Sequence, residues 1–290
     1  MKLWQEFRQP TTITEAIEDL TTAPQPAMPI AGGSDLLLDI RQGRHAPVHT
    51  LVDLKSVTEM NVIEQRGQEL FIGASMSITS IIQNELTLKN ARALVEACNL
   101  IAGPQVRNAA TLGGNVAHAL PAADGTIALL ALNAHAEVAS KVGLRRMLFQ
   151  DLFLGPGKST IDKTCELITG FYLMLANSGQ ASCFKRIMRP QGVALPILNC
   201  AVWVCRDVDA VVDVRISVGP GGPVPFRATE AEASLKGRPL DEDQINKALE
   251  KLLSQAKFRT SPLRATAAYR QHIVKTLFKD TFTEAWIRAA

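Results

Sequence analysis

The sequence predicts an α+β fold in two parts, the second an antiparallel sheet covered by helices. Three observations predict this class. The first half alternates short helical and strand-like segments around pairs of glycines. The last third holds a continuous apolar run over 197–205 and an alternating run over 212–218, followed by two long helical patterns. At 290 residues the chain exceeds the usual size of one hydrophobic core, which favours two domains.

Residues 1–56 are expected to form a compact unit of the βαβ kind. Thr12-Ile13-Thr14-Glu15 fits a capping box, in which the threonine and glutamate side chains bind the first free N–H groups of a helix. This helix is predicted to continue to about Leu20. The further elements expected here are a strand over 27–30, a turn at Gly32-Gly33, a helical turn over 36–40 and a buried strand at Leu51-Val52.

Residues 57–178 are expected to form a second subdomain. Arg66-Gly67-Gln68 separates two strand-like runs and predicts a hairpin. Apolar residues share one face over 90–101, which predicts a helix, and Asp124 opens a second apolar helix ending near Leu132. The other elements expected are a loop with Gly103-Pro104, a Gly-Gly turn at 113–114, and strands over 136–139 and 166–173.

Residues 179–290 are expected to form the sheet-and-helix domain. The run over 197–205 is apolar except for Asn199, as in a strand covered on both faces, whereas the alternation over 212–218 predicts a half-exposed strand. The glycines and prolines over 219–223 predict a turn. Two helices are predicted to follow, over 241–256 and 263–289, the second with its apolar residues on one stripe.

Composition excludes several classes of function. The chain is 47% hydrophobic, which excludes disorder, and 31 Lys+Arg against 28 Asp+Glu provide no concentrated basic footprint for nucleic acid. No apolar span approaches the roughly 20 residues of a membrane helix, and the N-terminus has no signal core. We therefore expect a cytoplasmic protein that binds no nucleic acid. Its five scattered cysteines form no C-x-x-C pair, so we expect small buried residues rather than disulfides or a metal site.

Several familiar motifs are absent or incomplete. Gly157-Lys158-Ser159 resembles the end of a Walker A loop, but Leu152 stands where that motif needs glycine, so a surface turn is expected. The chain has no G-x-G-x-x-G, which argues against a Rossmann dinucleotide site. It also lacks the histidine spacing of a metal site and the G-x-S-x-G of a hydrolase. No metal ligand or catalytic residue is therefore assigned.

Two Gly-Gly segments are better candidates for a binding site. Ala31-Gly32-Gly33-Ser34-Asp35 follows an apolar strand, and Thr111-Leu112-Gly113-Gly114-Asn115 lies between two helices. Because glycine lacks Cβ, backbone N–H groups can converge on an anion there, and Ser34, Thr111 and Asn115 add donors. Two such segments could close on the two phosphates of a dinucleotide. Ordinary turns are the commoner explanation of such pairs.

Five segments, in order along the chain, resemble the FAD-binding flavoprotein subunit of molybdenum hydroxylases. This group includes the medium subunits of xanthine dehydrogenase and carbon monoxide dehydrogenase. The resemblance implies the two-subdomain FAD-binding fold of the vanillyl-alcohol-oxidase (PCMH) type over 1–178, followed by a C-terminal domain over 179–290. The segments are 30–36, 101–108, 111–115 with Pro121-Ala122-Ala123-Asp124, 153–158, and Tyr269-Arg270-Gln271-His272.

The resemblance also implies a function. In this family electrons leave the substrate at a molybdenum cofactor on a large subunit and pass through two-iron two-sulfur clusters on a small subunit. FAD on the medium subunit then delivers them to an external acceptor. The chain would be an oxidoreductase subunit in a heteromeric complex, expected as a dimer of heterotrimers. Two alternatives are an assembly or insertion factor that kept the fold and lost FAD, and a standalone flavin oxidoreductase.

The resemblance implies roles for individual residues. Residues 28–35 and 111–115 would wrap the pyrophosphate, and Ile101 would lie against the flavin, which is compatible with a buried helix end. Asp124 would lie near the flavin and its ribityl chain; since a carboxylate repels a diphosphate, we expect it to accept hydrogen bonds from hydroxyls or amides. Lys185 would stabilise the reduced flavin, the alternative being a solvated strand lysine. The expected FAD contacts are Met28, Pro29, Ile30, Ala31, Gly32, Gly33, Ser34, Asp35, Ile101, Thr111, Leu112, Gly113, Gly114, Asn115, Asp124, Leu167 and Lys185.

Overall fold

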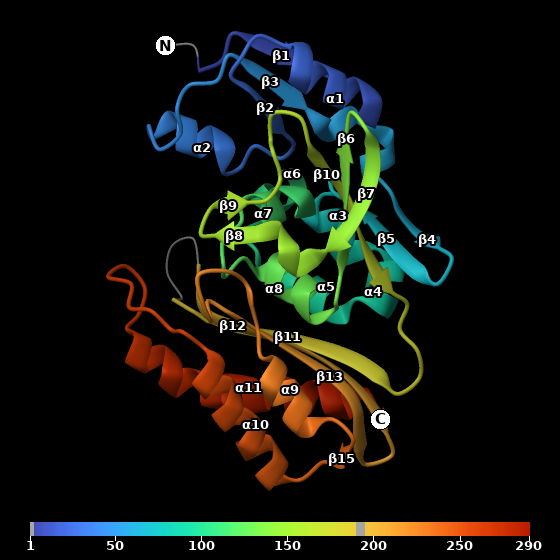
Figure 1. The fold of residues 1–290 in the computed structure, drawn as a ribbon, viewed down its shortest axis with the longest axis vertical. Helices are drawn as coiled ribbons and strands as arrows, with labels where there is room; N and C mark the ends of the chain where they lie inside the picture. The colour runs from blue at the N-terminus through green and yellow to red at the C-terminus, as the bar shows by residue number, and fades with distance from the viewer. Residues whose placement is uncertain (1–2, 190–194) are drawn as a thin grey trace.

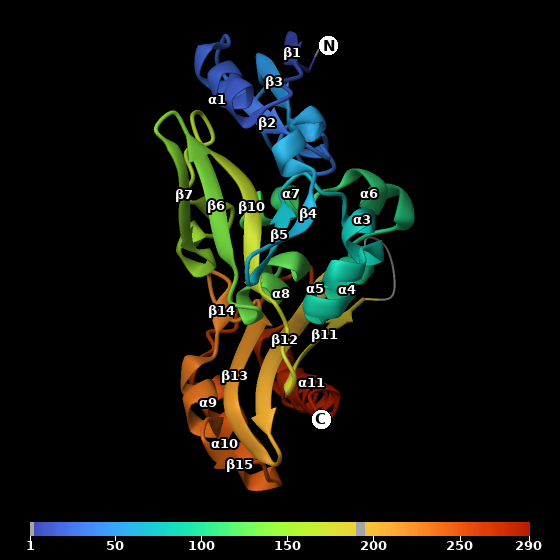
Figure 2. The same cartoon turned by 90° about the vertical axis from the view of Figure 1, so that its right-hand side faces the viewer.

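The computed structural model describes residues 3–189 and 195–290 and confirms the α+β fold. Three parts follow one another along the long axis of the molecule: a small N-terminal sheet, a middle sheet with its helices, and a C-terminal sheet with three helices (Figure 1). Figure 2 shows the same order after a quarter turn.

The N-terminal part is a three-stranded parallel sheet in the order β1-β3-β2. It consists of β1 (Glu6–Arg8), β2 (Ala27–Ile30) and β3 (Thr50–Asp53), with α1 (Ile13–Thr22) and α2 (Leu36–Arg41) in the connections. The capping box is confirmed, since Thr12 Oγ1 accepts the Glu15 N–H at 3.2 Å and Glu15 Oε2 accepts the Thr12 N–H at 3.3 Å. The sequence analysis missed β1, which is too short to show a periodic pattern.

The middle part is an antiparallel sheet in the order β4-β5-β10-β6-β7. The predicted hairpin is confirmed as β4 and β5, and β10 runs between β5 and β6 at the centre of the sheet. The strands are β4 (Ile63–Arg66), β5 (Glu69–Gly73), β6 (His135–Ser140), β7 (Gly143–Leu148) and β10 (Leu167–Met174), and the helices are α3 (Ile78–Gln83), α4 (Glu85–Asn90), α5 (Arg92–Leu100), α6 (Pro104–Ala109), α7 (Leu112–Ala117) and α8 (Asp124–Ala131).

The helix predicted over 90–101 is confirmed as α5, although it begins at Arg92 because the separate helix α4 ends at Asn90. Two other local predictions in this part were wrong. The loop predicted around Gly103-Pro104 is α6, with the proline in its first turn, where no N–H is needed. The Gly-Gly turn predicted at 113–114 is the first turn of α7, since Thr111 caps that helix by accepting the Gly114 N–H at 3.0 Å.

The predicted surface turn lies at Pro156-Gly157, whereas Lys158 and Ser159 of the Gly-Lys-Ser segment form a short strand. The turn connects the two-stranded ribbon of β8 (Phe153–Gly155) and β9 (Lys158–Ser159). Gly157 supplies the positive φ of +71° that the turn requires.

The C-terminal part is an antiparallel sheet in the order β11-β12-β13-β14, with β15 paired to β13. The expected helix over 263–289 begins four residues later, where Thr266 caps it. No described helix is long and apolar enough to cross a membrane. The strands are β11 (Gln180–Met188), β12 (Pro196–Asp207), β13 (Ala210–Gly219), β14 (Phe226–Arg227) and β15 (Arg238–Pro239), and the helices are α9 (Thr229–Leu235), α10 (Glu242–Gln255) and α11 (Ala267–Arg288).

The C-terminal sheet is covered on both faces. One face carries Phe184 and Ala201, which belong to the same apolar cluster as the buried residues of α5 and α8. The other face packs against α9, α10 and α11 in a second cluster. Glu96 of α5 adds a polar link, because it accepts the Phe184 N–H at 2.9 Å and Arg288 Nη1 at 2.7 Å. The division into domains near residue 178 stays a prediction.

All five cysteines are free thiols, and their burial predicts their reactivity. Cys98, Cys183 and Cys200 are buried, and burial raises the pKa of each, to about 12 for Cys183 and Cys200. The thiolate is the reactive form, so we expect a thiol reagent to label only Cys165 and Cys205 in the native protein. Labelling with Ellman's reagent before and after unfolding in guanidinium checks this. Fast labelling of all five in the native state would contradict it.

Candidate functional site

The structure brings the two Gly-Gly segments, 31–35 and 111–115, together. Gly32 lies against the backbone that leads into the second segment. A Cβ on Gly32 would lie 2.7 Å from Ala110 Cα and would also collide with the Ala109 carbonyl. The first segment also approaches the residue that follows α7, since Asp35 Oδ2 lies 3.9 Å from His118 Nδ1. Only glycine permits this approach, which explains the first residue of the pair.

The first Gly-Gly segment presents free backbone donors. Among the described residues, none accepts a hydrogen bond from the N–H groups of Gly32, Gly33, Ser34 or Asp35. Gly33 has a φ of +66°, and Ser34 and Asp35 are exposed. Successive free N–H groups in such a turn form a concave site for an anion. This segment therefore fits a phosphate or diphosphate group.

The second Gly-Gly segment uses its N–H groups within the protein. Leu112 donates to the Met76 carbonyl at 3.3 Å, Gly113 to the Ala74 carbonyl at 2.8 Å, and Gly114 to Thr111 Oγ1. A Cβ on Gly113 would lie 2.6 Å from the Ala74 oxygen, so this glycine permits close packing of α7. The two segments are therefore not equivalent, because among the described residues the first keeps four free N–H groups and the second keeps only that of Thr111. Cofactor contacts by 111–115 stay a prediction, with Thr111 and Asn115 offering side chains.

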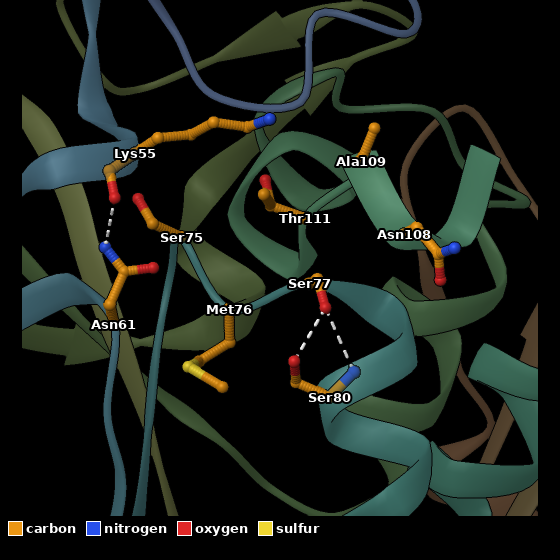
Figure 3. Close-up of a pocket in the computed structure, with 9 residues that line it drawn as sticks. All are labelled: Lys55, Asn61, Ser75, Met76, Ser77, Ser80, Asn108, Ala109 and Thr111. Carbon is orange, nitrogen blue, oxygen red and sulfur yellow. Dashed lines mark hydrogen bonds between the residues drawn. The ribbon is translucent and has the colours of Figure 1, made fainter. Parts of the chain in front are cut away.

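A polar pocket of about 360 Å³ lies next to this junction (Figure 3). The chain that leaves β5 runs beside the second Gly-Gly segment, where Ser77 forms a β-bridge with Thr111, and this pairing brings the residues of the pocket together. Hydroxyl and amide groups and one cation line it, which suits a ligand with phosphate and hydroxyl groups. The lining residues are Lys55, Asn61, Ser75, Met76, Ser77, Ser80, Asn108, Ala109 and Thr111.

The sequence analysis found only Thr111 of this pocket. Lys55 comes from the turn after β3, and the serines come from the segment after β5, so the pocket joins residues that are distant in sequence. The available signal was the run Ser75-Met76-Ser77 of small and polar residues directly after an apolar strand.

Lys55 is the cation of this pocket, and its replacement gives a test. Its exposed side chain reaches across the pocket toward Thr111 (Figure 3), and it forms no ion pair with a described residue. We expect Lys55→Met to weaken binding of FAD or ADP about 3- to 10-fold, with a smaller effect at high salt, because exposed charges are screened. Calorimetric titration at low and high salt measures this. Lys141→Met, an exposed lysine in the β6–β7 turn, is the control.

Asp124 begins α8 and is buried, with an exposure of 4%. Its Oδ1 accepts Asn199 Nδ2 at 2.7 Å, which agrees with the amide partner expected for it, and its Oδ2 pairs with Arg186 Nη1. The sequence analysis missed Arg186. Burial raises the pKa of Asp124, while the positive charge of Arg186 and the Asn199 hydrogen bond act in the opposite direction.

The remaining predicted contacts lie in different surroundings. Ile101 ends α5 and is half-buried against the main apolar cluster, and Leu167 is buried in that cluster at the start of β10. Lys185 lies on β11 between Cys183 and Ile187, which face the C-terminal helices, whereas Arg186 points to the opposite face. Ile30 is buried beneath α2, and Met28 packs beside it. Their contacts with a cofactor stay predictions.

Comparisons with known proteins identify the family of this chain. Residues 4–173 match the family described as the FAD binding domain in molybdopterin dehydrogenase, and residues 182–285 match the CO dehydrogenase flavoprotein C-terminal domain. Over 287 residues the chain is 29% identical to a putative xanthine dehydrogenase FAD-binding subunit of Escherichia coli strain K12, covering 96% of this chain and 95% of the relative.

Two further relatives extend the comparison. The nicotine 6-hydroxylase medium subunit of Paenarthrobacter nicotinovorans is 30% identical over 283 residues, covering 97% of each chain. A solved chain of carbon monoxide dehydrogenase from Hydrogenophaga pseudoflava superposes with a TM-score of 0.93 at 26% identity, covering 99% of this chain and 98% of the other. The free N–H groups of the first Gly-Gly segment fit the diphosphate of the cofactor that this family binds. The chain therefore belongs to the molybdenum hydroxylase flavoproteins, as a FAD-binding medium subunit and thus a subunit of an oxidoreductase.

Proposed function

We propose that this chain transfers electrons from iron–sulfur clusters of a partner subunit to an external acceptor through bound FAD. The observation that carries the proposal is the first Gly-Gly segment, whose N–H groups have no acceptor in the part of the chain that the structure describes, while Gly32 packs directly on the backbone before Thr111. A chain that had lost its flavin would have no need to keep these donors free. This favours the electron-transfer role over the assembly-factor alternative.

Bound FAD would supply the redox chemistry, accepting electrons singly or in pairs. The residues of this chain would hold it. The N–H groups of 32–35 would donate to the diphosphate, and Lys55 would add a positive charge near it. Asp124 and Ile101 would contact the flavin end, with Asp124 kept in place by Asn199 and Arg186.

The proposal includes two partner subunits. One is a large subunit with the molybdenum cofactor, and the other is a small subunit with two-iron two-sulfur clusters, assembled with this chain as a dimer of heterotrimers. Relatives named as medium chains of carbon monoxide dehydrogenase and as a subunit of a dehydrogenase complex support a heteromeric assembly. The proposal places the complex in the cytoplasm, where five free thiols stay reduced.

The proposal is tested with the purified chain alone and with co-expressed partners. We expect the chain alone to be yellow, to release FAD on heating and to rebind it, and to be reduced by dithionite without oxidising any substrate itself. With its partners, its flavin should be reduced by the substrate of the complex. A colourless chain that cannot be reconstituted would favour the assembly factor, and substrate turnover by the chain alone would favour a standalone oxidoreductase.

A further inference from the structure

Arg186 connects the C-terminal sheet to two segments of the FAD-binding part. Its side chain is 4% exposed, as is that of Asp124. Nη1 pairs with Asp124 Oδ2 at the start of α8, and Nη2 donates to the Leu100 carbonyl at the end of α5. Leu100 directly precedes Ile101. One guanidinium therefore binds one predicted flavin contact, Asp124, directly and the residue before another, Ile101.

The guanidinium connects segments that are distant in the sequence. Arg186 is on β11, Asp124 is 62 residues earlier in sequence, and Leu100 is 86 residues earlier. The planar fork of arginine binds two acceptors in a fixed geometry, which a lysine cannot do. Leu100 and Asp124 are thereby held at a defined separation.

Polar atoms around this junction are buried without a hydrogen-bond partner. Among the described residues they include Arg186 Nε, Asn199 Oδ1 and Asn115 Oδ1. Asn115 lies beneath α8, where a Cβ on Gly125 would come within 2.8 Å of its Oδ1. Buried polar atoms without partners are costly and are uncommon away from functional sites, so they indicate that a polar ligand or ordered water completes the junction.

We propose that Arg186 is a positioning residue of the flavin site, which holds the Asp124 carboxyl group in a buried ion pair and orients Ile101 through the Leu100 carbonyl. This inference rests on the proposed function, because it takes Asp124 and Ile101 as flavin contacts. It assigns the buried positive charge of the site to Arg186, since Lys185 lies on the opposite face of β11. The C-terminal sheet thus completes a site whose other residues belong to the first 178 residues.

The electrostatic consequence can be measured. Among the described residues, the titratable and polar groups around Asp124 are Arg186 on β11, Asn199 on β12 and Cys98 on α5, and only Arg186 brings a positive charge. Without it, Asp124 either keeps an uncompensated negative charge or takes up a proton. An uncompensated negative charge disfavours the reduced flavin, which is richer in electrons. A tenfold change in the ratio of the affinities for oxidised and reduced flavin corresponds to about 30 mV for a two-electron couple.

The experiment compares full-length variants. For Arg186→Gln we expect FAD to bind about tenfold more weakly. We also expect the midpoint potential of the bound flavin to fall by about 30 mV, because the reduced flavin is disfavoured. Arg186→Lys should recover most of the potential, since it keeps the charge, but not the affinity, since it cannot hold Asp124 and Leu100 together. Quenching of flavin fluorescence gives the affinity, and spectroelectrochemical titration gives the potential.

Arg227→Gln is the matched control. Arg227 also comes from the C-terminal sheet, pairs with Glu232 at 2.8 Å, and donates to Asn133 Oδ1 beyond the far end of α8. The substitution removes an ion pair that is more exposed than Arg186–Asp124, and it leaves Asp124 and Leu100 untouched. We expect its FAD affinity and potential to match those of the wild type.

The outcomes separate the two proposals. If Arg186→Gln folds and keeps the wild-type affinity and potential, the positioning role is wrong. If Arg186→Gln does not fold, the double variant Asp124→Asn/Arg186→Gln, which buries no unpaired charge, replaces it; wild-type affinity in that variant would also overturn the role. A wild-type chain that binds no FAD would overturn the proposed function itself, and this inference with it.

Discussion

Replacing Gly33 with valine is expected to abolish FAD retention while leaving the chain folded. Gly33 has a φ of +66°, a conformation that costs a β-branched residue at least about 1–2 kcal/mol. Its Cβ would lie 3.1 Å from Ile30 Cδ1 and from Leu37 Cδ1, so the loop must shift. A shift in φ turns the neighbouring N–H groups away from a common point. The fold should survive, because both contacts are with the ends of flexible side chains at the edge of the cluster of β2 and α2, which can move by a few tenths of an ångström.

The flavin content of the purified variant, read as the ratio of visible to protein absorbance, tests this expectation, and far-UV circular dichroism reports folding. Gly43→Val is the matched control. Gly43 has a φ of +70°, at the other end of α2, and a Cβ there would meet no atom within 4 Å. It imposes the same kind of backbone strain away from the free N–H groups. Equal flavin content in the Gly33 variant and the wild type would refute the phosphate site.

Replacing Arg186 with glutamine is expected to cost about 3–5 kcal/mol of folding stability at neutral pH. Both members of the Arg186–Asp124 pair are 4% exposed, so the substitution leaves a buried carboxylate without its cation. Removing one member of a buried ion pair is far more costly than removing both, because the remaining charge is not solvated. Urea unfolding followed by circular dichroism measures the loss.

The loss should depend on pH in a defined direction. Burial raises the pKa of Asp124, and the Arg186 charge opposes that effect, so the pKa rises further in the variant. A folded state that keeps a proton which the unfolded chain has released becomes less stable as the pH rises. The stability that the variant loses relative to the wild type should therefore be smallest in acid. It should grow as the pH rises above the pKa of Asp124 in the wild type. Asp124→Asn/Arg186→Gln should lack this dependence; a loss that is constant with pH in the single variant would contradict the assignment.

Periodic elements of this fold could be predicted from the sequence. The capping box at Thr12, the hairpin around Gly67 and the doubly covered strand over 197–205 each carry their signal within a few neighbouring residues. Helix α6 and strand β7 could not be found in this way. No residue of α6 is buried, and β7 is exposed at every position except Met147. Neither element therefore shows an apolar pattern in the sequence.

The candidate site could be predicted only where one short segment forms it. Residues 31–35 carry their own signal in two glycines and their flanking polar residues. The sequence pattern predicts a phosphate-binding role for Gly113, whereas its N–H donates to the Ala74 carbonyl and the absence of a Cβ lets that carbonyl approach. Arg186 and Lys55 were missed because their partners lie on other elements, and pairings between distant residues leave no mark in a single sequence.

Strand β12 has a consequence for how the molecule unfolds. Its alternate residues belong to different apolar clusters, with Ala201 facing α5 and α8 and Cys200 facing α11. Loss of either cluster would therefore expose one face of β12 to solvent and weaken its pairing with β11 and β13. We expect native-state hydrogen exchange to find the slowest amides in β12, and both halves of the chain to open in a single cooperative step. Although the sequence predicts two domains, the chain would then unfold as one cooperative unit.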